Sequence, residues 1–151
     1  MGLKIKIEDA ARHALKNQEP LLLSVLRLLL SAIHNREIEK RAGADTGDLT
    51  DEEVTAVIRS EAKKRKDAVA EYGRGGRPAA ADKEAAELAI LEKYLPAELS
   101  DEEIETLLLP LAKGALMKDF GRVMGAAMKV VAGRASGERV AAAVKRILDR
   151  K

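Results

Sequence analysis

The spacing of the apolar residues constrains the fold of this chain more than any other feature, because it is helical from end to end. In seven consecutive segments the apolar side chains recur three and four residues apart, which is the period of one face of an α-helix. No segment alternates apolar and polar residues in the manner of a half-buried strand. The pattern therefore predicts an all-α protein of about seven helices.

Prolines, glycines and capping motifs separate the predicted helices. Thr50 and Ser100 each stand three residues before a glutamate, the arrangement of a capping box that starts a helix. Pro20 suits a first helical turn, whereas Pro96 stops the helix before it. The predicted helices span about 3–16, 20–41, 50–72, 79–95, 100–113, 118–131 and 136–148.

We expect two small bundles, an N-terminal four-helix domain of residues 1–96 and a C-terminal three-helix domain of residues 97–151. The second helix is apolar nearly all round in its first half, which predicts a place at the centre of the N-terminal bundle. Residues 42–49 and 73–78 contain glycines and are predicted loops, the second a mobile one. The predicted inner face of the fourth helix consists of Ala81, Ala85, Leu88, Leu91 and Leu95.

Composition excludes several classes of protein. There is no cysteine, so disulfides and thiolate metal sites are excluded. The longest apolar stretch, residues 21–33, is interrupted by polar side chains and is shorter than the roughly 20 residues of a membrane span. Residues 1–8 lack the apolar run of a signal peptide. We expect a soluble cytoplasmic protein that does not bind membranes.

The sequence offers no catalytic centre. His13 and His34 are the two histidines, and neither stands in a metal-ligand spacing. No serine lies in a nucleophile elbow, and the carboxylate pairs, such as Glu84 and Glu87, suit a solvated helix face. We therefore predict no catalytic residue, no metal site and no cofactor.

Charge is distributed unevenly along the second half of the chain. Residues 79–112 carry 2 basic and 9 acidic side chains, net −7, and residues 113–151 carry 10 basic and 3 acidic, net +7. The basic segment can meet a polyanion or dock on the acidic segment, and charge alone leaves both open. Within it, the turn 133–137 before a helix N-terminus is a candidate phosphate site. The basic cluster comprises Lys118, Arg122, Lys129, Arg134, Arg139, Lys145, Arg146, Arg150 and Lys151.

Aromatic residues make up only 2% of the chain, so stacking of unpaired bases is poorly supported. If the chain binds nucleic acid, it reads backbone and shape, as a folded tRNA would permit.

Seven short motifs, taken in order and spacing, resemble the GatB/YqeY family. The resemblance covers essentially the whole chain. The motifs are Leu30–Ile38 (LSAIHNREI), Glu52–Val54 (EEV), Gly75–Arg77 (GGR), Glu87–Pro96 (ELAILEKYLP), Leu99–Glu103 (LSDEE), Met117–Gly125 (MKDFGRVMG) and Gly133–Gly137 (GRASG).

The resemblance implies a relation to the C-terminal tail of GatB, a subunit of the glutamine-dependent tRNA amidotransferase whose catalytic sites lie in other domains. That tail contacts tRNA. Through the motif that the two share, the resemblance implies that Lys129, Arg134 and Arg139 contact RNA. Lys129 stands where the family often has proline, and residues 113–116 look short. The expected function is a tRNA-binding accessory module in translation. Alternatives are a protein-interaction adaptor, with a partner in aminoacyl-tRNA synthesis, or a component of carbon–nitrogen ligase activity with glutamine as amido-N-donor.

Overall fold

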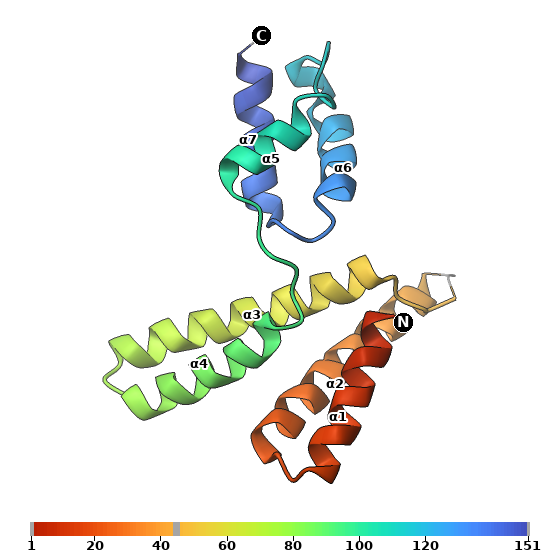
Figure 1. Ribbon diagram of the computed structural model, residues 1–151. Helices are drawn as coiled ribbons and strands as arrows, with labels where there is room; N and C mark the ends of the chain where they lie inside the picture. The colour runs from red at the N-terminus through yellow and green to blue at the C-terminus, as the bar shows by residue number, and fades with distance from the viewer. Residues whose placement is uncertain (1, 44–45, 151) are drawn as a thin grey trace. The chain divides into compact units, whose positions relative to one another are not determined.

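The structure, a computed structural model, describes residues 2–43 and 46–150 (Figure 1). These residues form seven α-helices, one short 3-10 helix and connecting turns, with no strand among them, so the predicted all-α fold is confirmed. The chain divides into two compact units, Met1–Leu95 and Pro96–Lys151. Residues 44–45 of the predicted loop and Lys151 of the basic cluster lie outside the described residues.

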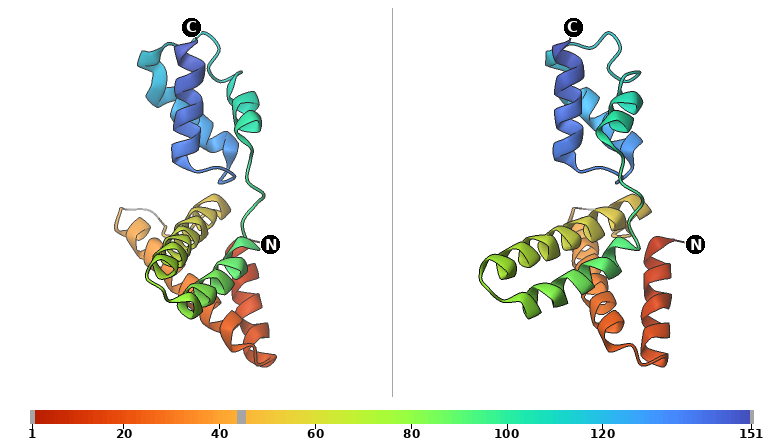
Figure 2. Two further views of the ribbon diagram at one scale, coloured as in Figure 1. Left: turned by 90° about the vertical axis from the view of Figure 1, so that its left-hand side faces the viewer. Right: turned by 60° about the vertical axis from the view of Figure 1, so that its left-hand side comes forward.

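The N-terminal unit consists of two helical hairpins. Helices α1 (Leu3–Lys16) and α2 (Pro20–Ala42) form the first, and α3 (Asp51–Arg74) and α4 (Pro78–Glu92) form the second. Figure 2 shows the two helices of each hairpin running side by side. The hairpins meet over a shared aliphatic core, whose buried members are Ile7, Ala11, Val25, Leu26, Leu29, Ile33, Val54, Ile58, Ala62 and Leu91.

Both predicted capping boxes are confirmed. The Thr50 hydroxyl accepts a hydrogen bond from the Glu53 amide at 3.1 Å, and the Glu53 carboxylate accepts one from the Thr50 amide at 3.3 Å. Ser100 and Glu103 exchange the same two bonds, at 3.1 and 2.8 Å, at the start of the C-terminal unit's first helix. Each box satisfies two amides that a helix N-terminus otherwise leaves without an acceptor.

Three details of the N-terminal unit differ from the prediction. Ala85 is exposed, and α4 turns Glu87 inward instead, because Arg65 of α3 supplies a counter-charge. Helix α2 buries one face only, so Leu21 and Leu28 stay exposed. The predicted loop 73–78 is also shorter than expected: α3 continues through Arg74, and hydrogen bonds to the last turn of α3 close the connection.

The C-terminal unit packs three helices around a second aliphatic core. They are α5 (Asp101–Leu108), α6 (Phe120–Val131) and α7 (Gly137–Asp149), and the 3-10 helix η1 (Met117–Asp119) leads into α6. Helix α5 ends about five residues earlier than predicted, and turns cover the stretch to Gly114. The buried residues of α6 and α7 recur three and four positions apart, as expected for one face of each helix. These residues are Val123, Ala127, Val131, Val140, Ala143, Val144, Ile147 and Leu148.

None of the helices among the described residues combines the length and the apolar character that a membrane crossing requires.

Candidate nucleic-acid interface

The outward side of α6 carries a row of cations. Lys118 in η1 and Arg122 and Lys129 in α6 lie four and seven residues apart, which places them on one side of the helix. All three are exposed, and the inner residues of α6 occupy the opposite side. Helix α6 itself contains no aspartate or glutamate. The one acid beside it, Asp119, accepts a hydrogen bond from the Leu116 amide at 2.8 Å.

Ion pairs with the acidic segment involve few of the C-terminal cations. Arg139 pairs with Glu98 and Asp101, and Arg150 pairs with Glu105. Within the described part of the chain, no ion pair involves the other cations of this unit. These are Lys113, Lys118, Arg122, Lys129, Arg134, Lys145 and Arg146. The acidic segment therefore neutralises one edge of the unit and leaves the α6 side positively charged.

Arg134 and Arg139 are brought together at the backbone of Leu99. The carbonyl oxygen of Arg134 accepts a hydrogen bond from the Leu99 amide at 2.9 Å, and the Arg134 Nε donates to the Val131 carbonyl at 3.2 Å. The Arg139 Nη2 donates to the Leu99 carbonyl at 2.7 Å and to Asp101 Oδ1 at 2.8 Å. The Arg139 guanidinium thus holds the segment before α5 against the start of α7.

The three residues singled out by the resemblance therefore occupy different environments. Lys129 is exposed on the α6 side, Arg134 is half-buried in the α6–α7 turn, and Arg139 is engaged within the fold. The geometry adds Lys118 and Arg122 to Lys129. The spacing of these three cations can be read from the sequence, although the motif match did not single them out as a group.

The N-terminus of α7, where a phosphate could bind, already has a hydroxyl and a carboxylate from the chain itself. The Ser136 hydroxyl accepts a hydrogen bond from the Arg139 amide at 3.3 Å, and Glu138 adds a negative charge in the first turn. A phosphate at the turn 133–137 would have to share this helix end with both groups, so the exposed α6 side is the more accessible surface.

Lys145 extends the basic surface onto α7. Its ammonium lies 6.0 Å from the centre of the Phe120 ring at the start of α6, within the range of a cation–π contact. This contact places a fourth cation next to the end of α6 where Lys118 and Arg122 stand.

Two glycines interrupt the cationic row. Gly121 and Gly125 are exposed on α6, and a methyl group added at either position would meet no atom within 4 Å beyond its chain neighbours and the nearby backbone of its own helix. Glycine inside a helix costs about 1 kcal/mol relative to alanine, and neither position offers a packing reason for it.

We therefore expect Gly125→Ala to raise the unfolding free energy of the C-terminal unit by about 1 kcal/mol. Urea unfolding followed by the NMR signals of Val123 and Val144 measures it. Gly114→Ala is the matched control, because its surroundings are equally open but its φ is +76°, so the same substitution should destabilise. Equal effects of the two substitutions would contradict the expectation.

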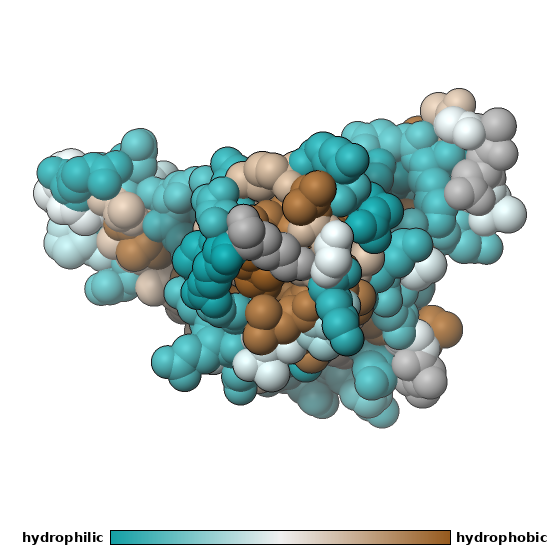
Figure 3. Space-filling model, turned by 90° about the horizontal axis from the view of Figure 1, so that it is seen from above, coloured by the Kyte–Doolittle hydropathy of each residue, from teal (hydrophilic) through white to brown (hydrophobic). Residues whose placement is uncertain are grey.

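Apolar side chains gather at the end of the C-terminal unit that carries the C-terminus (Figure 3). Leu109 and Leu116, from the segment between α5 and η1, and Met117, the first residue of η1, are each about half exposed. The surface beside Lys118 is therefore both basic and apolar.

No group of three or more histidines, aspartates and glutamates gathers in the described residues in a way that could hold a metal ion. His13 and His34 are both exposed on the N-terminal unit.

Taken together, the fold and the site define an all-helical, two-unit protein whose C-terminal three-helix unit presents a cationic helix face. The family model of the YqeY-like protein matches residues 4–148, almost the whole chain. The chain therefore belongs to the YqeY-like protein family. No curated protein matches the chain.

Proposed function

We propose that this protein is an accessory module that binds the phosphate backbone of folded tRNA and has no catalytic centre of its own. The relation of the family to the tail of the GatB amidotransferase subunit suggests tRNA as the ligand. One observation of this chain carries the proposal: Lys118 in η1, with Arg122 and Lys129 in the acid-free helix α6, are exposed on one side, and none of them forms an ion pair with a described residue.

The side chains favour backbone recognition over base recognition. Lysine is a point charge on a flexible stem and suits phosphate contacts, which fix position without reading sequence. Stacking of unpaired bases would need exposed aromatic rings, but Tyr72, Tyr94 and Phe120 are all partly buried. A folded RNA with a regular phosphate path therefore matches this surface better than a single strand.

The test is a titration of the purified protein with total tRNA at about 50 and 200 mM salt. The double variant Arg122→Glu/Lys129→Glu should bind at least about tenfold more weakly at the lower salt. Its slope of log K against log salt should be shallower by about 2, because roughly one counterion per lost phosphate contact is no longer released.

The matched control is Lys16→Glu/Lys83→Glu, which changes the net charge equally at two exposed positions of the N-terminal unit. It should leave binding nearly unchanged. A similar loss in both double variants would show that only net charge matters, and the absence of binding at low salt would rule the proposal out.

A second candidate function, a protein-interaction adaptor, rests on the exposed apolar side chains of Leu109, Leu116 and Met117. Such side chains gain nothing from phosphate groups but would be buried against a protein. Weak, salt-insensitive tRNA binding would favour this candidate.

A further inference from the structure

Helix α2 has a second face, with three large aliphatic and three uncharged polar side chains, that the N-terminal unit does not cover. Its core face holds Leu26, Leu29 and Ile33. On the outward side, six exposed residues recur alternately three and four positions apart, which is the a/d spacing of a helix that packs along another helix. We call them the α2 seam; they are Leu21, Ser24, Leu28, Ser31, Asn35 and Ile38.

The largest side chains of the α2 seam are strongly exposed. Leu28 is 55% exposed, Ile38 48% and Leu21 42%, so one helix presents three large aliphatic groups to water. Leu21 and Leu28 lie seven positions apart and Ile38 lies ten further on, so all three fall on a or d positions of the seam. Scattered exposed leucines are ordinary on protein surfaces, but three large aliphatic groups on one side of a helix over about 18 residues indicate an interaction face.

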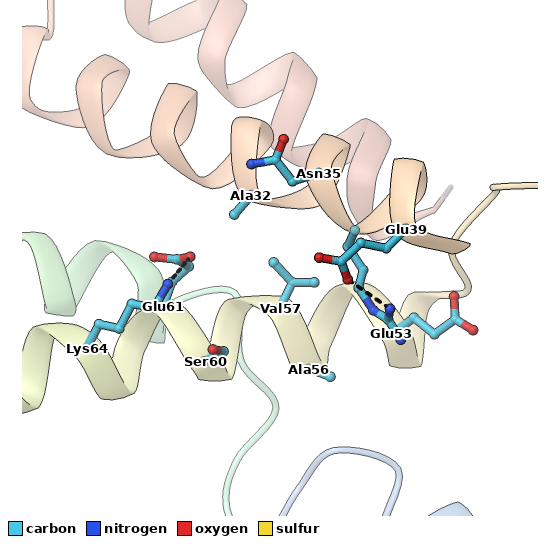
Figure 4. Close-up of a pocket in the computed structure, with 10 residues that line it drawn as sticks. Ala32, Asn35, Glu39, Glu53, Ala56, Val57, Ser60, Glu61 and Lys64 are labelled. Atoms are coloured by element: carbon cyan, nitrogen blue, oxygen red, sulfur yellow. Dashed lines mark hydrogen bonds and ion pairs between the residues drawn. The ribbon is translucent and has the colours of Figure 1, made fainter. Parts of the chain in front are cut away.

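A groove between α2 and α3 borders the seam at Asn35. The groove has a volume of about 420 Å³, and Asn35 belongs to both the seam and the groove lining. Ala32 and Val57 point into the space between the two helices (Figure 4). With Ala56 and Ser60 also in the lining, the side chains between the charged edges are small. Small side chains at a contact allow helix axes to approach closely, so the groove suits a third helix.

Charge distinguishes between possible occupants. Arg27, His34 and Arg41 follow one edge of the seam at intervals of seven, and all three are exposed. The other edge is mixed, with the pairs Arg36–Glu39 and Lys64–Glu61, each at 3.2 Å. The Arg36–Glu39 pair is exposed, and exposed pairs contribute little and can exchange partners, whereas Glu61 is partly buried.

A second copy of this chain fits the edge charges poorly. An antiparallel two-fold pairing of α2 helices places like edges on the same side, so Arg27 and Arg41 would face the cations of the other copy. An RNA backbone fits the apolar part poorly, because phosphates would leave Leu21, Leu28 and Ile38 without a partner. A partner helix with aliphatic residues along one face and carboxylates along one edge would cover the aliphatic residues of the seam and pair with the basic edge of Arg27 and Arg41.

We propose that the α2 seam and the α2–α3 groove form a docking site for an amphipathic helix of a partner protein, with leucine or isoleucine at heptad spacing and acidic residues along one edge. This site lies wholly in the N-terminal unit and does not depend on tRNA binding by the C-terminal unit.

The experiment uses the full-length, isotope-labelled chain and a synthetic helical peptide of about 20 residues, with leucines at seam positions and glutamates along one edge. A second peptide has lysines in place of the glutamates. We expect the acidic peptide to shift the amide NMR signals of residues 21–39 and 53–64, and to bind at least tenfold more tightly than the basic peptide at about 50 mM salt.

Leu28→Glu should weaken binding of the acidic peptide at least tenfold, and because Leu28 is exposed the amide spectrum should otherwise keep its folded pattern. Val130→Glu, at an exposed position of the C-terminal unit, is the matched control and should have no effect. Three outcomes overturn the proposal: equal binding by the Leu28→Glu variant, shifts confined to other residues, or displacement of the peptide from α2 by total tRNA.

Discussion

Replacing Arg65 by methionine should lower the unfolding free energy of the N-terminal unit by about 3 kcal/mol. The Arg65 Nε lies 3.1 Å from a carboxylate oxygen of Glu87, and the guanidinium is also near Glu84. The side chains of Arg65 and Glu87 are only 15% and 11% exposed. Methionine keeps most of the aliphatic bulk, so the main effect is a nearly buried carboxylate without its counter-charge.

Tyrosine absorbance and near-ultraviolet circular dichroism during urea unfolding measure this loss for one unit alone. Tyr72 and Tyr94 are the two tyrosines of the chain, and both belong to the N-terminal unit. A probe confined to one unit matters because a chain of two compact units need not unfold in a single step.

Two further variants distinguish the effect of breaking the buried Arg65–Glu87 pair from the effect of simply removing a positive charge. The double variant Arg65→Met/Glu87→Leu should recover most of the lost stability, because it removes both charges from the same contact. Arg74→Met should change stability by less than about 0.5 kcal/mol, because its pair with Glu71 is about three-quarters exposed. If Arg65→Met cost no more than Arg74→Met, the Arg65–Glu87 contact would not stabilise the hairpin.

The helices themselves were predictable because their signals are local. A capping box needs only four consecutive residues, and the Thr50 and Ser100 boxes form as the sequence indicates. The buried faces of α6 and α7 follow from apolar spacing, since their buried residues recur three and four positions apart. In both cases the residues that decide the structure lie within a few positions of one another.

The orientation of α4 was less predictable. Its sequence is rich in alanine, so burial of one face or another differs little in apolar area. Arg65, from a different helix, then favours the face with Glu87, and Ala85 turns outward. For α2, apolar residues on all sides predicted a central helix. It does contact α1, α3 and α4, but these helices leave Leu21 and Leu28 on its outward side exposed.

In the candidate site, too, features set by neighbouring residues could be predicted from the sequence, and contacts between distant residues could not. The spacing of Lys118, Arg122 and Lys129 on one helix side can be read from the sequence, as can the absence of acids in α6. The hydrogen bond of Arg139 to the Leu99 carbonyl joins residues 40 positions apart, and no motif indicates it. A residue selected for RNA contact by resemblance therefore proves to have partners inside its own unit.

This internal role leads to the second large effect: Arg139→Ala should lower the unfolding free energy of the C-terminal unit by about 2 kcal/mol. The substitution removes a charged donor from the Leu99 carbonyl and frees Asp101, and a hydrogen bond to a charged group contributes about 1.5–3 kcal/mol. Thermal unfolding followed by the NMR signals of Val123 and Val144 measures the loss. Lys129→Ala, at an exposed position without an ion pair to a described residue, should leave stability nearly unchanged.

For tRNA binding the order should be reversed: Lys129→Ala should have the larger effect and Arg139→Ala the smaller one. At a temperature where both variants are folded, Lys129→Ala should weaken binding at low salt and reduce its salt dependence, because it removes a phosphate contact. Arg139→Ala should leave both nearly unchanged, since its guanidinium is directed to Leu99 and Asp101. A fully folded Arg139→Ala variant that binds tRNA as weakly as Lys129→Ala would instead show that Arg139 exchanges its internal partners for RNA. The hydrogen bond to Leu99 would then be a contact that the ligand opens, because one guanidinium cannot keep both sets of partners.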